Sequence, residues 1–225
     1  EFRRVLFRSE SIAELEHITG RAASNLTRTL HTLESYGLVE LQDASSQAVV
    51  ASLYLTPNAK VLDYCAGGGG KTLAMAAQAR LTLFAHDANP TRMTDLPPRA
   101  KRAGAKVTLL ESPAKSAPYD LILTDVPCSG SGSWRRDPQG KWALTPEKLA
   151  EVTTLQASIL DTVAPMVAPQ GVLAYATCSM LRAENEAQID AFLSRHSGWS
   201  RIGSRRFSPL DGADGFFIAM LTRKI

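Results

Sequence analysis

The pattern of hydrophobic and polar residues changes near residue 61. Within residues 10–37, apolar positions recur at helical spacing on both sides of Gly20, which predicts a helix, a turn and a second helix. From Val61 onward, short apolar runs alternate with helical patterns. Strands that are separated by helices are joined by parallel crossovers, so this part predicts an α/β protein with a doubly wound sheet.

The alternation divides residues 61–224 into ten elements. The predicted strands are 61–66, 82–88, 107–111, 119–126, 171–179 and 215–224. The predicted helices are 71–79, 91–103 (interrupted at Pro97 and Pro98), 146–163 and 184–196. A long loop is expected between the fourth strand and the third helix.

The chain before this region divides into two parts. Residues 1–9, EFRRVLFRS, lack both an initiator Met and the pattern of a signal peptide. RVLFRS is also what a translated sequencing adaptor would encode, so we expect an artefact there. Residues 10–37 resemble the helix-turn-helix of winged-helix regulators, with a plain helical hairpin as the alternative. Residues 38–225 are expected to form the main domain.

Composition narrows the class of protein. Of the 225 residues, 44% are apolar and 21% charged, and the net charge of +3 permits a nucleic-acid partner without requiring one. No apolar run approaches the length of a membrane span, so no membrane partner is expected. Three widely spaced cysteines suggest neither a disulfide framework nor a metal site. We expect a cytoplasmic monomer without a bound metal.

Five reactive side chains follow the predicted strands. They are Cys65, Asp87, Asp125, Cys128 and Cys178. Ligands of doubly wound sheets bind beyond the carboxyl ends of the strands, so these residues are predicted to share one rim of the sheet. For each cysteine, a small buried side chain is the alternative interpretation.

The stretch CAGGGGKT at 65–72 predicts a loop that a ligand approaches closely. A phosphate-binding loop is disfavoured because Cys65 stands where its first glycine must be. Asp87, 24 residues after Asp63, is placed as the acid that binds a ribose. The loop and Asp87 therefore indicate an adenosine-containing ligand, which could belong to a dinucleotide or to S-adenosylmethionine.

Two further motifs carry a family resemblance. They are TDVPCSGSGSWRRDPQGKW at 124–142 and ATCSM at 176–180, with VELQDASSQAV, ENE and DGFF as additional matches. Over about residues 38–224 the chain resembles the RsmB/NOP/Sun-type RNA (cytosine-5) methyltransferases. The resemblance implies a Rossmann-like class I methyltransferase fold, S-adenosylmethionine as cofactor, and RNA as substrate, with ribosomal RNA expected.

The resemblance also implies the roles of particular residues. Cys178 would be the nucleophile that adds to carbon 6 of cytosine, because cytosine carbon 5 is itself a poor nucleophile. Cys128 would assist breakdown of the covalent adduct. Asp125 would contact the cofactor or the cytosine edge, and Lys71 would lie where cofactor and base meet. The implied cofactor-binding residues are Cys65, Ala66, Gly67, Gly68, Gly69, Gly70, Lys71, Asp87 and Asp125.

The basic loop after the fourth strand is a candidate RNA contact. Arg135, Arg136 and Lys141 are predicted to contact phosphates, with Trp134 and Trp142 as stacking surfaces. The alternative is a solvated basic loop.

The chain departs from the family pattern at two places. Gly68 replaces the family's proline, which should preserve cofactor binding with a looser loop. The family's acid after the third strand should fall near Glu111 or Ser112, and neither is assigned.

Two other function classes stay open. One is a winged-helix DNA-binding protein with an inactive domain, which would prefer duplex DNA to structured RNA. The other is a magnesium-dependent NTPase, against which the substituted glycine argues.

Overall fold

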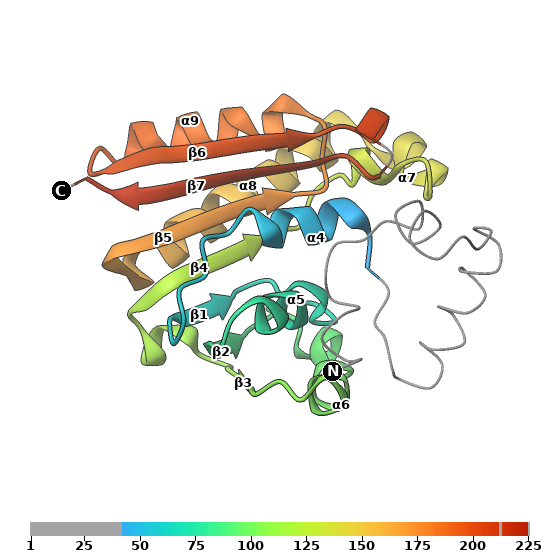
Figure 1. Cartoon of the computed structure of the whole chain (residues 1–225). Coiled ribbons are helices and arrows are strands. Elements are labelled where there is room, and N and C mark those ends of the chain that lie inside the picture. The colour runs from blue at the N-terminus through green and yellow to red at the C-terminus, as the bar shows by residue number, and fades with distance from the viewer. Residues whose placement is uncertain (1–41, 212, 225) are drawn as a thin grey trace.

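One sheet organises the part of the chain that the computed structural model describes, residues 42–211 and 213–224 (Figure 1). The predictions for residues 1–9 and 10–37 lie outside these described residues. The seven strands of the sheet run in the order β3-β2-β1-β4-β5-β7-β6. Their bounds are β1 Lys60–Asp63, β2 Thr82–Ala85, β3 Val107–Leu109, β4 Tyr119–Asp125, β5 Val167–Thr177, β6 Trp199–Phe207 and β7 Phe216–Arg223.

Helices cover both faces of this sheet (Figure 1). The α-helices are α4 Ala44–Ala51, α5 Gly70–Gln78, α6 Leu96–Ala103, α7 Pro138–Ala143, α8 Pro146–Val163 and α9 Glu186–Arg195. Short 3₁₀ helices are Pro90–Met93, Pro113–Ser116, Ser131–Ser133, Ala164–Met166, Arg182–Glu184 and Pro209–Asp211. One core cluster joins the sheet to α8 and α9, and a second joins it to α4 and α5. None of the helices within the described ranges is long and apolar enough to cross a membrane.

Strands β1 to β5 confirm the predicted parallel arrangement. β1 pairs in parallel with β2 and β4, and further parallel pairs join β2 to β3 and β4 to β5. These strands read as apolar runs because helices bury both faces of a parallel sheet. The order in which successive strands are added to the sheet reverses between β1 and β4, and ligands of such sheets bind at this switch point.

The last two strands correct the prediction of an entirely parallel sheet. β6 was not predicted, because polar and basic residues fill it and only Trp199 and Phe207 at its ends are buried. Such a composition suits an edge strand, whose exposed side needs no apolar residues. β7 therefore arrives from a neighbouring strand rather than from a helix, and it pairs antiparallel with both β5 and β6.

Two helical details also differ from prediction. Pro97 and Pro98 do not interrupt a helix, because α6 begins at Leu96 and both prolines occupy its first turn. The first amides of a helix have no intrahelical partner, so proline is tolerated there. The predicted long loop after β4 contains the short helix α7, whereas α8 has the predicted bounds of 146–163.

A backbone contact fixes the loop after β4 against the loop that precedes β7. The amide of Gly215 donates to the carbonyl of Gly132 over 3.0 Å, and the amide of Gly132 donates to the carbonyl of Cys178 over 2.9 Å. A Cβ atom on Gly132 would overlap the backbone of Gly215. The approach of these two loops therefore requires glycine at position 132.

Gly132→Ala should lower the free energy of unfolding by about 1–3 kcal/mol, the usual cost of overpacking, because backbone atoms must move apart. Gly198→Ala is the matched control, since a Cβ atom there meets nothing within 4 Å. It should change stability by less than about 0.5 kcal/mol. Urea denaturation measures both, and equal stability of the two variants would contradict the argument.

Candidate active site

Two neighbouring parallel strands deliver the cysteines to one rim of the sheet. Asp125 at the end of β4 is in register with Ala176 of β5, and the Val126 amide donates to the Ala176 carbonyl over 3.0 Å. Cys128 follows β4 by three residues, and Cys178 follows β5 directly. The structure thus brings together Asp125, Cys128 and Cys178 as the sequence predicts.

The sulfur atoms of Cys128 and Cys178 lie 3.3 Å apart, within hydrogen-bonding distance. The hydrogen bond from Cys128 lowers the pKa of Cys178, and the nearby Lys71 ammonium adds to this effect, while burial opposes it. The same hydrogen bond and burial raise the pKa of Cys128. The pair therefore favours a thiolate at Cys178 and a thiol at Cys128, which is the division of roles that the resemblance implies.

Lys71 and Asp125 form an ion pair beside the cysteines. Lys71 Nζ lies 2.6 Å from Asp125 Oδ2 and 5.0 Å from the centre of the Phe216 ring. Burial acts to lower the pKa of Lys71, but Asp125 outweighs it and the pKa is raised. A charged ammonium therefore stays at the rim. The sequence analysis missed Phe216, although its DGFF motif was a possible signal.

The glycine loop needs glycine at two of its four positions. Gly67 has φ +51° and Gly69 has φ +82°, and both values lie in the left-handed region that favours glycine. A Cβ atom on Gly69 would also overlap the Leu96 side chain. Gly68 is exposed and lacks a positive φ, so the residue that replaces the family's proline is not required by backbone geometry.

Asp87 lies directly beneath this loop. Its Oδ2 accepts from the Gly67 amide over 2.9 Å and its Oδ1 from the Asn89 amide over 2.9 Å. The Arg92 guanidinium reaches Oδ2 over 3.3 Å, and the Asp87 side chain is only 4% exposed. Each carboxylate oxygen has two lone pairs, so Asp87 keeps acceptor capacity, but Arg92 covers it.

Cys65 lies in the same region without a reactive environment. Burial, and after it the neighbouring Asp63, raise the pKa of its thiol. The protonated form is therefore favoured, which fits the interpretation of Cys65 as a small residue that lines the site.

Asp63 is a buried acid that the sequence analysis used only as a landmark. It ends β1, is 1% exposed, and its Oδ2 accepts from the Thr72 hydroxyl over 2.6 Å, while Oδ1 has no hydrogen-bond partner among residues 42–211 and 213–224. Burial raises the pKa of Asp63 to about 7, although the hydrogen bond from Thr72 acts to lower it. The sequence feature that could have pointed to Asp63 is its position as an acid at the end of an otherwise apolar strand.

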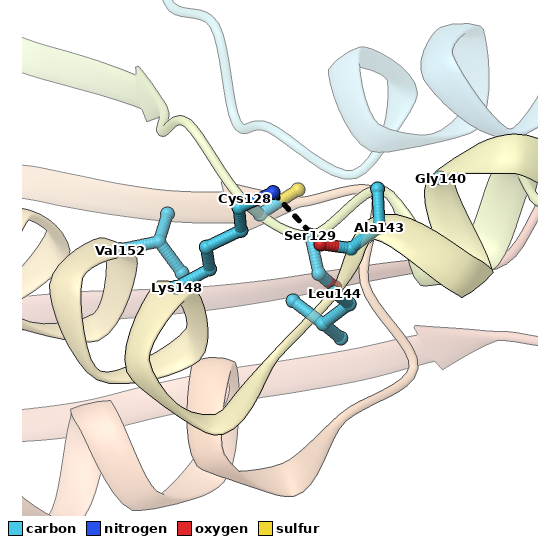
Figure 2. A pocket seen from close by; sticks show the side chains of 7 residues that line it. All are labelled: Cys128, Ser129, Gly140, Ala143, Leu144, Lys148 and Val152. Atoms are coloured by element: carbon cyan, nitrogen blue, oxygen red, sulfur yellow. Dashed lines mark hydrogen bonds between the residues drawn. The ribbon is translucent and has the colours of Figure 1, made fainter.

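A pocket of about 250 Å³ opens beside Cys128 (Figure 2). Its lining residues come from the loop after β4 and from the α7–α8 region, and they are Cys128, Ser129, Gly140, Ala143, Leu144, Lys148 and Val152. Lys148 Nζ donates to the Ala143 carbonyl over 2.9 Å across this pocket. Cys128 therefore borders an open pocket on this side. Within the described ranges, no group of three or more His, Cys, Asp or Glu side chains could hold a metal ion.

The predicted RNA contacts differ in their surroundings. Arg136 binds the buried carboxylate of Asp214 through both Nε and a terminal nitrogen, so its charge already has a protein partner. Arg135 is 68% exposed and lies 3.7 Å from Asp214. Lys141 lies over the Trp142 ring at 5.5 Å, and Trp142 is 81% exposed.

Arg135, Lys141 and Trp142 thus stay the better placed candidates for RNA. Trp134 is half-buried, which limits it as a stacking surface. Glu111 lies two residues beyond β3 with an exposed side chain, and its role stays unassigned.

Solved structures with this fold define the class of protein. A crystal structure described as a methyltransferase homolog from Pyrococcus horikoshii is 26% identical, covers 84% of this chain and 69% of that chain, and has a TM-score of 0.71. The crystal structure of the protein PH0851 is 31% identical, covers 83% of this chain and 47% of that chain, and has a TM-score of 0.76. The fold is therefore the Rossmann-like fold of S-adenosylmethionine-dependent methyltransferases.

Sequence comparison then gives the family. A family model described as 16S rRNA methyltransferase RsmB/F matches residues 50–222. This chain belongs to the RsmB/F family of 16S rRNA methyltransferases. A second model, described as HVO_A0114, matches residues 8–54.

Curated relatives of the family are about twice as long as this chain. The protein named ribosomal RNA small subunit methyltransferase B from Salmonella arizonae is 38% identical over 213 residues. The match covers 87% of this chain and 50% of that protein. The chain therefore spans about half the length of the curated relatives that it matches.

Asp63 predicts a pH dependence of stability. The unfolded acid should ionise near its ordinary pKa of 3.8, whereas the folded acid keeps its proton up to about 7. The folded state then binds more protons between these values, so its stability should fall by a few kcal/mol as pH rises from about 4 to about 7.

Asp63→Asn should lack this component of the pH dependence, because the amide does not ionise. Urea denaturation of both proteins at pH 4 to 8 measures it, with Asp190→Asn on the exposed face of α9 as the control. Parallel pH profiles for wild type and Asp63→Asn would refute a buried acid with a raised pKa.

Proposed function

We propose that this chain is the catalytic part of an S-adenosylmethionine-dependent RNA (cytosine-5) methyltransferase that acts on small-subunit ribosomal RNA in the cytoplasm. The observation that carries the proposal is the pair of thiols 3.3 Å apart, with the pKa of Cys178 lowered and that of Cys128 raised. Membership of the RsmB/F family and the names of the curated relatives support the choice of substrate.

The residues at the rim fit the proposed cofactor. The loop 65–70 leads into the first turn of α5, whose first amides have no intrahelical partner and can face a carboxylate. Asp87 keeps lone pairs for ribose hydroxyls once the exposed side chain of Arg92 moves aside. When bound, S-adenosylmethionine supplies an electrophilic methyl group on a sulfonium.

The proposed reaction begins and ends at Cys178. Its thiolate adds to carbon 6 of cytosine, forming a carbon–sulfur bond and making carbon 5 nucleophilic toward the methyl group. Lys71 and Asp125 would orient the base edge. After methylation a base removes the proton from carbon 5, and the electron pair breaks the carbon–sulfur bond. The Cys128 thiol, within hydrogen-bonding distance, then stabilises the departing Cys178 thiolate.

RNA that contains 5-azacytidine should form a covalent adduct with the wild-type chain in the presence of S-adenosylmethionine, because its ring nitrogen at position 5 has no proton to lose. Cys178→Ala should abolish the adduct, whereas Cys128→Ala should retain it. A denaturing gel measures the outcome. An adduct that survives in Cys178→Ala but not in Cys128→Ala would exchange the two roles.

Cofactor binding is tested separately from RNA chemistry. Asp87→Asn should weaken binding of S-adenosylmethionine by about 10–100-fold, because a hydrogen bond to a charged group contributes about 1.5–3 kcal/mol. Asp95→Asn is the control, since Asp95 is exposed before α6 and makes no capping hydrogen bond. Isothermal titration calorimetry measures both. An unchanged affinity of Asp87→Asn would remove Asp87 from the cofactor site.

A further inference from the structure

A buried carboxylate lies behind the two cysteine loops. Glu184 is 0% exposed, and its partners among the described residues are neutral hydrogen-bond donors. Burying a charge is costly unless hydrogen bonds satisfy it. A buried carboxylate at this place therefore indicates that it contributes to the arrangement around it.

The carboxylate joins the serine that follows one cysteine to the serine that follows the other. Oε1 of Glu184 accepts from the Ser129 amide over 2.7 Å, and Oε2 accepts from the Ser129 hydroxyl over 2.5 Å. The same Oε2 accepts from the Ser179 hydroxyl over 2.5 Å. One side chain thus restrains both Cys-Ser pairs.

Other contacts anchor Glu184 itself. Gln156 of α8 donates to Oε1 of Glu184 over 3.1 Å and to the Pro127 carbonyl over 2.9 Å. The Tyr175 hydroxyl donates to the Glu184 carbonyl over 2.6 Å. Glu184 is therefore fixed to β5 through its backbone carbonyl and to α8 through its carboxylate, so it can hold the loops rather than follow them.

The charge of Glu184 also acts on one thiol of the pair. The pKa of Cys128 is raised first by its hydrogen bond to Cys178, then by burial, with the Glu184 carboxylate as a further contribution. A negative charge near a thiol disfavours its ionisation. A neutral side chain of the same shape could hold the loops without this effect.

We propose that Glu184 is the positioning residue of the thiol pair: through the serines that follow the two cysteines it holds the two sulfurs in contact, and its negative charge acts on Cys128. The inference rests on the proposed function for what the pair does. Its tests use thiol chemistry without RNA or cofactor, so their outcome is independent of whether the chain methylates cytosine.

The effect of the Glu184 charge is tested in a Cys178→Ser background, in which Cys128 is the only thiol of the pair. Alkylation of Cys128 by iodoacetamide is followed against pH by peptide mass spectrometry. Adding Glu184→Gln should move the profile to lower pH, because a nearby like charge disfavours ionisation of the thiol. Glu186→Gln is the matched control, because Glu186 pairs with Arg206 instead. No shift with Glu184→Gln, or an equal shift with Glu186→Gln, would overturn the electrostatic role.

The positioning role of Glu184 is tested by the rate at which diamide oxidises the two thiols to a disulfide. This rate depends on how close the two sulfurs lie. Glu184→Gln should stay within about twofold of wild type, because the amide can accept from the Ser129 amide and its NH₂ can donate to the serine hydroxyls. Glu184→Ala should slow the reaction at least tenfold. Disulfide formation at the wild-type rate in Glu184→Ala would overturn the positioning role.

If thermal melting shows that Glu184→Ala does not fold, Ser179→Ala replaces it. This variant removes the hydroxyl that ties the loop after β5 to Glu184, together with its hydrogen bonds to the Ser129 and Ser131 hydroxyls and to the Leu181 amide. It should slow disulfide formation by at least threefold, and an unchanged rate would again contradict the proposal.

Discussion

The parallel pairing of β4 with β5 is the constraint on which the candidate active site depends. Because the two strands are neighbours with their carboxyl ends at the same edge, loops 50 residues apart in the chain meet at one point. Cys128 and Cys178 could not share a proton if either strand were shifted in register. A one-residue slip would also turn the buried face of the strand outward, so core packing and site geometry are fixed together.

Charged side chains at the rim have partners within the protein. Lys71 is paired with Asp125, Asp87 accepts two backbone amides, and Glu184 accepts four hydrogen bonds. The Asp63 carboxyl accepts one hydrogen bond from the described part of the chain, and its raised pKa is the consequence of burial with so little compensation. The neighbouring acids thus differ in how far hydrogen bonds and ion pairs compensate their burial.

The sequence predicted much of this arrangement because the relevant signals are local. Apolar runs located the five parallel strands, and reactive residues at their ends located the rim. The glycine run indicated a tight turn, although only Gly67 and Gly69 have the backbone conformation that demands glycine. β6 escaped prediction because an edge strand need not be apolar, and β7 was assigned the wrong direction as a consequence.

The sequence by itself determined the strand and helix alternation, the family resemblance and the identity of the two cysteines. Only the tertiary structure decided how their neighbours act. Arg136 reads as a free basic residue in sequence, yet it pairs with Asp214, 78 residues away. Glu184 belongs in the sequence only to the ENE match, yet it is buried and accepts hydrogen bonds from both cysteine loops. Hydrogen-bond partners and burial depend on contacts between distant segments, and a linear pattern does not contain these contacts.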